Sequence, residues 1–137
     1  MSAGKDLYSN LSVQPAILPA SISATTTPVS VDRQGYESVL AVVNCGAMTT
    51  ITNGVNDYTL SLVESDDGST FTAVAAADII GAADNTIVTL ETGSAGLTYQ
   101  LGYKGNKRYV SVLATERGTA VAIFGATIVL GSPHVVA

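Results

Sequence analysis

The residue types that carry most enzyme chemistry are scarce in this chain of 137 residues. Its one histidine, His134, follows Pro133 close to the C-terminal end, and its one cysteine, Cys45, has no basic neighbour in the sequence. A Ser-His-Asp triad needs its base held rigidly beside the nucleophile, which a histidine in a tail does not provide. The Gly-x-Ser-x-Gly motif is also absent. We therefore predict that the protein is not an enzyme and that Cys45 is a small buried hydrophobic residue.

The acidic stretch Asp66-Asp67-Gly68 can be read as a calcium loop or as a turn. An EF-hand needs oxygen ligands at alternate positions and a distant bidentate glutamate, and the stretch does not match that pattern. Aspartate tolerates turn geometry and accepts hydrogen bonds from its own backbone, while glycine adopts positive φ at no steric cost. We favour the turn, and we predict no metal and no cofactor.

One basic and aromatic cluster is formed by Tyr103, Lys104, Lys107 and Arg108. A solvated turn explains it without any function. Arginine and tyrosine are also favoured in protein interfaces, so the alternative is a contact patch for an acidic protein surface. The candidate protein contacts are Tyr103, Lys104 and Arg108 of this cluster, together with Leu7 and Tyr8 near the N-terminus.

The elements that must position these residues are predicted to be β-strands. Residues 58–76 are predicted to form a β-hairpin, because Tyr58, Leu60 and Leu62 fall on one face of an extended chain. Gly68 lies in the turn that follows, and an Asp-Gly pair between two β-rich runs is a strong hairpin signal. No stretch of the sequence shows a sustained helical period.

Three further segments define the expected sheet. Residues 98–114 are predicted to form a second hairpin with a tight turn at 104–107. The run Val39–Val43 is apolar on both faces, which is typical of a central strand. Pro15 and Pro19 remove hydrogen-bond donors, so the segment they bracket is predicted to be a sheet edge or an extended strap.

These strands predict an all-β chain folded as a single antiparallel β-sandwich. The last long strand is expected over 120–130, with Gly125 marking a bulge or a close backbone approach. A jelly roll and an immunoglobulin-like sandwich both fit the strand spacing, but the Cys…Trp…Cys core of an immunoglobulin domain is absent. We predict a jelly roll, with residues 1–14 as an N-terminal arm and first strand and residues 15–137 as the single sandwich domain.

The charge pattern limits the classes of partner that the protein can bind. The net charge is −5 and there is no run of basic residues, so we expect no direct binding to nucleic acid. Only 12% of the residues are charged, which predicts that other protein covers much of the surface; a small domain with a Thr- and Ser-rich surface is the alternative. The first ten residues are polar and the longest apolar run is short, so we expect neither a signal peptide nor a membrane span.

Five stretches, in this order and spacing, resemble the small jelly-roll capsid cement (decoration) proteins of tailed bacteriophages. They are Asp6–Asn10, Glu64–Thr72, Ala77–Gly81, Gly102–Val110 and Gly131–His134. They are turn and strand motifs, and the resemblance that they carry extends over most of the chain. The turn at 65–71 also occurs in carbohydrate-binding sandwiches.

The resemblance implies a structural virion protein. Such a protein is made in the cytoplasm of the bacterial host and binds the outer surface of an icosahedral capsid. It clamps neighbouring subunits of the major capsid protein and stabilises the shell against the pressure of packaged DNA. Its expected partners are the major capsid protein and a second copy of itself, as a homodimer at two-fold positions. The alternatives are a carbohydrate-binding sandwich module, or another virion part such as a connector or tail protein.

Overall fold

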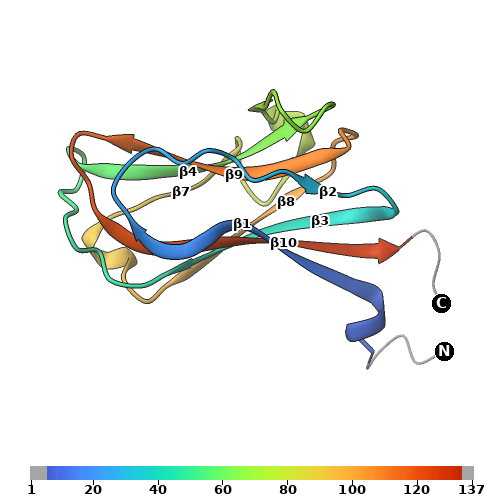
Figure 1. Ribbon diagram of the computed structural model, residues 1–137, viewed down its shortest axis with the longest axis horizontal. Helices are drawn as coiled ribbons and strands as arrows, with labels where there is room; N and C mark the ends of the chain where they lie inside the picture. The colour runs from blue at the N-terminus through green and yellow to red at the C-terminus, as the bar shows by residue number, and fades with distance from the viewer. Residues whose placement is uncertain (1–5, 134–137) are drawn as a thin grey trace.

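The computed structural model describes residues 6–133 as two antiparallel β-sheets packed face to face. Figure 1 shows the two sheets as two layers, with the described ends of the chain at the same end of the molecule. Apart from three short 3-10 turns, every regular element of this part of the chain is a strand. The prediction of an all-β antiparallel sandwich is confirmed.

Each sheet combines strands from both halves of the chain. Sheet A has the order β1 (Leu11–Ile22), β10 (Ala122–Pro133), β3 (Tyr36–Cys45), β8 (Thr98–Tyr103) and β6 (Ile79–Ile80). Sheet B has the order β2 (Val31–Asp32), β9 (Tyr109–Arg117), β4 (Asp57–Ser65) and β5 (Thr72–Ala73), and β7 (Thr86–Thr89) also pairs with β4.

The strand pairing is nested from the two ends of the chain inward. Apart from the two-residue strands β5 and β6, β1 pairs with β10, β2 with β9, β3 with β8, and β4 with β7. Successive pairs alternate between the two sheets, so the chain is wound as a double strip around one core. This winding is the jelly roll.

The core lies between the sheets and follows the alternation of the strands. Tyr58, Leu60 and Leu62 of β4 are all fully buried, as their spacing predicts. The ring of Tyr58 meets Phe124 of β10 edge to face, with 5.3 Å between the ring centroids. This contact joins the two sheets, and each large side chain buried in this way contributes about 1.5–3 kcal/mol to stability.

The hairpin predicted for residues 58–76 is present, but its return strand is short. β4 runs to Ser65, and Gly68 has a φ of +78°, which suits glycine. The return strand β5 pairs only Ala73 with Val63 and Thr72 with Glu64. The chain then makes the 3-10 turn η2 (Ala76–Asp78) and crosses to sheet A as β6.

The prediction of a second hairpin over 98–114 is wrong. β8 pairs with β3 in sheet A, whereas β9 pairs with β4 in sheet B, so the connection between β8 and β9 crosses from one sheet to the other. Tyr103 explains the crossing, because its side chain points into the core and is 2% exposed. Its hydroxyl donates to Glu64 Oε1 at 2.8 Å and accepts from the Lys107 backbone N–H at 3.1 Å. The connection therefore wraps around a buried side chain instead of turning back beside its own strand.

The proline-containing segment is an edge strand, as predicted. β1 lies at the edge of sheet A and pairs with β10, with register shifts between Pro15 and Ile17 and between Ile17 and Ala20. These irregularities fall where proline cannot donate a ladder hydrogen bond. β1 starts at Leu11 and runs without interruption across the predicted boundary between residues 14 and 15.

Replacing Tyr103 by phenylalanine tests the crossing between the sheets. We expect Tyr103→Phe to lower the free energy of unfolding by about 2 kcal/mol, because the buried Glu64 carboxylate loses its hydroxyl donor. Tyr109→Phe is the matched control, since the Tyr109 ring lies under the Arg108 guanidinium and is only half-buried. Urea unfolding of the two variants measures the difference, and equal small losses in both would contradict this role for Tyr103.

Candidate protein-binding surfaces

The structure gives no support to a metal site. Within residues 6–133, no group of three or more histidine, cysteine, aspartate and glutamate residues lies close enough to hold a metal ion. His134 lies outside the described residues. Cys45 is buried, and its burial raises the pKa of the thiol above its ordinary value. A thiol with a raised pKa is a poor nucleophile at neutral pH.

The acidic turn is held by its own hydrogen bonds. Asp67 Oδ1 accepts from the Ser65 hydroxyl at 2.9 Å and from the backbone N–H groups of Ser69 and Thr70 at 2.8 and 2.9 Å. These hydrogen bonds favour the ionised carboxylate and lower the pKa of Asp67 to about 2, the bond from Thr70 having the largest effect. The carboxylate thus serves the turn itself, as turn chemistry predicts.

The structure separates the members of the predicted basic and aromatic cluster. Tyr103 is buried, so its side chain is not part of a surface, and its assignment as a protein contact must be corrected. Arg108 is exposed and pairs with both carboxylate oxygens of Asp32, at 3.1 and 2.8 Å. Lys104 is exposed at the end of β8, where its backbone N–H donates to Asp78 O at 2.9 Å. Lys104 and Arg108 remain candidate contacts on the surface.

The other two predicted contacts, Leu7 and Tyr8, lie on a hydrogen-bonded turn that exposes them to solvent. Tyr8 is 94% exposed and Leu7 is 69% exposed, although both are large apolar side chains. The 3-10 turn η1 (Tyr8–Asn10) carries them, and Asp6 closes it: Asp6 Oδ1 accepts from the Ser9 N–H at 3.0 Å. The side chain of Asn10 donates to the Asp6 carbonyl at 2.6 Å.

These residues line a shallow apolar cleft at the start of β1. Leu7 and Tyr8 form it together with Leu11 and Val13, and Val13 is itself 63% exposed. We call these four residues the N-terminal apolar cluster. Exposed apolar side chains that gather at one place indicate a surface for another molecule.

The outer face of sheet A is a second unusual surface. The only charged residue in its five strands is Glu37, which has the same strand parity as the core residues Val39 and Ala41. Every residue with outward parity in these strands is therefore uncharged. The aliphatic residues of this uncharged face include Leu40, Val42, Ile80, Ile123 and Val129. Leu11 and Val13 of the N-terminal apolar cluster share its outward side, because they pair with Gly131 and Val129.

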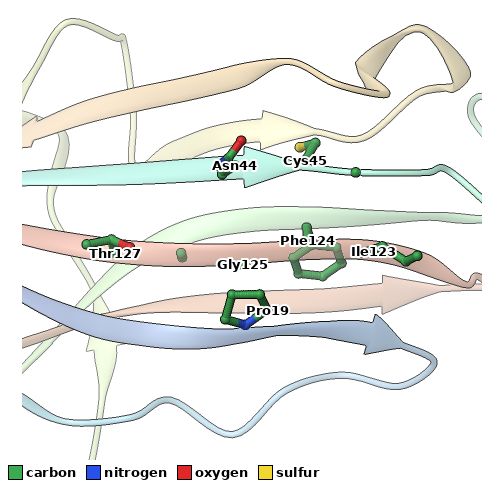
Figure 2. Close-up of a pocket in the computed structure, with 9 residues that line it drawn as sticks. Pro19, Asn44, Cys45, Ile123, Phe124, Gly125 and Thr127 are labelled. Atoms are coloured by element: carbon green, nitrogen blue, oxygen red, sulfur yellow. The ribbon is translucent and has the colours of Figure 1, made fainter.

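A hollow lined by Pro19, Asn44, Ile123 and Thr127 lies in the uncharged face beside Gly125, where Pro19 of β1 takes the place that a side chain on β10 would fill. A Cβ atom on Gly125 would lie 3.0 Å from Pro19 Cγ and 3.2 Å from the Ile17 carbonyl oxygen, so β1 approaches β10 closely at this point. Figure 2 shows Gly125 between Pro19 on β1 and Asn44 on β3. The close approach predicted for Gly125 is confirmed.

Sequence reasoning did not find the uncharged face. The signal was present, because none of the segments 11–22, 98–103 and 122–133 contains a charged residue. It could not be used without the topology, which makes β1, β10, β3 and β8 neighbours in one sheet.

Comparison of the chain with protein-family models, with curated proteins and with solved structures finds no match in any of the three. In the part of the chain that the structure describes, no helix has the length and apolar character needed to cross a membrane.

The lowered pKa of Asp67 in the acidic turn predicts that the stability of the protein depends on pH. Asp67 has a lowered pKa in the folded protein, so its contribution to stability is complete above the unfolded pKa, near 3.8, and is lost as the pH falls through about 2. Asp67→Asn should therefore lower the melting temperature at pH 6, and the difference from the unchanged protein should shrink as the pH falls from 4 toward 2.

Asp66→Asn is the control, because Asp66 forms only an exposed ion pair with Lys107. Melting curves between pH 2 and 7 measure both variants. A difference for Asp67→Asn that stays constant down to pH 2, or a rise in melting temperature with added calcium ions, would contradict the turn assignment.

Proposed function

We propose that the protein binds the outer surface of a bacteriophage capsid and clamps neighbouring subunits of the major capsid protein. The observation that carries the proposal is the N-terminal apolar cluster, in which a hydrogen-bonded turn holds Leu7 and Tyr8 out into solvent. Tyrosine and large aliphatic side chains that become buried against a partner supply much of the binding energy of protein interfaces.

The resemblance of five stretches to jelly-roll cement proteins supports this assignment, and the jelly-roll winding agrees with it. The low content of charge also agrees, because a surface covered by other protein needs little charge for solubility. The absence of a basic run fits a protein that acts on the shell and not on the packaged DNA.

A clamp of this kind works through avidity. A homodimer has two N-terminal apolar clusters, and each can bind a different capsid subunit. Once one cluster is bound, the second binds at a high effective concentration, so modest contacts give a slow overall release. Separation of the two shell subunits then requires one of the two contacts to break.

The carbohydrate-binding alternative is less well supported. Sugar-binding sandwiches stack sugar rings on exposed aromatic side chains, and tryptophan is absent from the chain. Among the described aromatic residues only Tyr8 is exposed, while the others are buried or half-buried. A single exposed ring at the N-terminal turn does not form a platform for a sugar.

Substitution of Tyr8 tests the proposal. Tyr8→Ser should weaken binding to expanded shells of the major capsid protein from the same genome by about tenfold or more, because the turn loses its most exposed anchor. The melting temperature should not change, since Tyr8 is 94% exposed and makes no contribution to the core. Co-sedimentation of the protein with purified shells measures the binding.

Val55→Ser is the matched control, because Val55 is an apolar residue that is 58% exposed in a distant loop. This variant should bind shells as the unchanged protein does. If the unchanged protein does not sediment with the shells, the proposed function is wrong. If Tyr8→Ser binds normally, the contact lies elsewhere.

A further inference from the structure

We infer that the N-terminal apolar cluster and the uncharged face form one continuous docking surface, whose occupant is an uncharged, apolar patch on the outer surface of a capsid subunit. The inference rests on the proposed function and deepens it, because it extends the shell contact from the η1 turn across the width of sheet A. It also gives that contact a chemical character, since burial of apolar surface and not charge pairing holds the protein on the shell.

The strand register places an apolar row across all five strands of sheet A. Residues directly opposite each other in neighbouring strands lie on the same side of a sheet. The row is made by the pairing of Val13 with Val129, Val129 with Leu40, Leu40 with Gly102 and Gly102 with Ile80. At about 4.8 Å between strands, it is about 19 Å long. Because Val13 also belongs to the N-terminal apolar cluster, a partner that covers the cluster meets the row without a break.

The outward glycines make this surface flat. A Cβ atom on Gly131 would lie 3.1 Å from Leu11 Cδ2, and one on Gly102 would lie 3.0 Å from Ile80 Cβ. At both positions an apolar side chain from the neighbouring strand therefore lies over the glycine, as at the hollow beside Gly125. A flat surface of short apolar side chains packs closely against a partner over a broad area.

The distribution of charge indicates the character of the occupant. Glu37 is the only charged residue in the strands of sheet A, and it has inward parity. Asp6 precedes η1 and Lys104 directly follows β8, so both belong to the margin of the surface. Charges at the rim and none at the centre are typical of protein interfaces. A charged patch of a partner would lose its hydration against this face without gaining an ion pair, so the occupant is uncharged.

The polar side chains of the face can be covered at little cost. Asn44 Oδ1 accepts from the Thr98 hydroxyl at 3.2 Å, and the hydroxyl oxygens of Ser38 and Ser132 lie 2.8 Å apart. A polar group that loses water and has no partner costs about 1–3 kcal/mol. These groups keep a partner within the sheet when another molecule displaces their water.

The size of the surface fits a capsid subunit as the occupant. With about 3.3 Å per residue and about 4.8 Å between strands, sheet A covers about 650 Å² on one side, and the N-terminal apolar cluster adds to this. A standard interface buries about 800 Å² on each partner. A second copy on this face would also cover Leu11 and Val13, which share its outward side, and would keep the cluster from the shell.

The salt dependence of binding is the first test. Co-sedimentation with expanded shells of the major capsid protein from the same genome should give dissociation constants within about threefold of each other at about 50 and about 500 mM sodium chloride. The reason is that a contact without ion pairs is not screened by salt. A loss of affinity of about tenfold or more at the higher concentration would overturn the inference and indicate a charged contact.

Thr127→Lys places a charge at the centre of the face. Thr127 pairs with Val42 of β3 and with Pro15 of β1 on the outward side. The variant should bind shells about tenfold or more weakly, because the lysine would be covered without a partner. Thr115→Lys is the matched control, since it makes the same change on the outer side of sheet B and should bind as the unchanged protein does. Melting curves check that both variants keep the fold.

Gln100→Glu is a milder variant that keeps the shape of the side chain. Gln100 is exposed on β8, where it pairs with Val42, and β10 and β3 separate β8 from β1 and its cluster. The added charge should weaken shell binding by about fivefold or more. Gln34→Glu makes the same change in the exposed turn between β2 and β3 and should leave the binding unchanged.

The results separate the inference from the proposed function. If neither Thr127→Lys nor Gln100→Glu weakens binding while Tyr8→Ser does, the inference is wrong and the clamp stands. If the unchanged protein does not bind shells, both are wrong. Sedimentation equilibrium without shells tests a second copy as the occupant: a dimer that Thr127→Lys dissociates and Thr115→Lys does not would also overturn the inference.

Discussion

The pairing of β1 with β10 is the interaction on which the rest of the structure depends. It joins the two ends of the described chain over a register that runs from Leu11 opposite Gly131 to Ile22 opposite Ala122. Without it, β10 would lose a neighbour and the nested winding would open at its outermost pair. The same pairing brings Pro19 against Gly125 and fixes the position of the turn that carries Leu7 and Tyr8.

Two surfaces follow from that one pairing. β1 and β10 are two of the five strands of sheet A, and neither contains a charged residue. The outward positions of β3, β8 and β6 are also uncharged, so the whole outward side of the sheet carries no charge. β1 is also an edge strand whose first residues lead into η1, so the N-terminal apolar cluster lies at the margin of that same sheet. Apart from Glu37 of β3, the charged side chains of the described residues lie on sheet B and outside the strands, as with Arg117, which pairs with the buried Asp57. An acidic protein with few charges thereby keeps a broad neutral face.

The sequence predicts what depends on local pattern. The alternation of Tyr58, Leu60 and Leu62 identifies the core face of β4, and Asp67 with Gly68 identifies its turn. The sequence does not predict features that depend on which strands pack against each other across the core. The strands on either side of 104–108 look like a hairpin because each alternates, but alternation does not tell whether a connection stays in one sheet.

The candidate contact residues also divide into those that the local sequence predicts and those that only the topology reveals. Leu7 and Tyr8 could be predicted to reach the surface, since a short polar arm cannot bury them, and both are exposed; their role as contacts stays a prediction. The burial of Tyr103 could not be predicted, because its hydroxyl donates a hydrogen bond to Glu64, a residue 39 positions away in the sequence. The uncharged face also needed the topology, which gathers segments from both ends of the chain into one sheet.

Electron cryomicroscopy of capsid shells incubated with this protein tests the central claim most directly, because a density map shows which surface of the protein meets the shell. The account predicts paired jelly rolls across two-fold positions, with each η1 turn on a different capsid subunit. Shells that carry no added density would contradict the account. So would bound copies whose η1 turns lie in solvent, away from the shell.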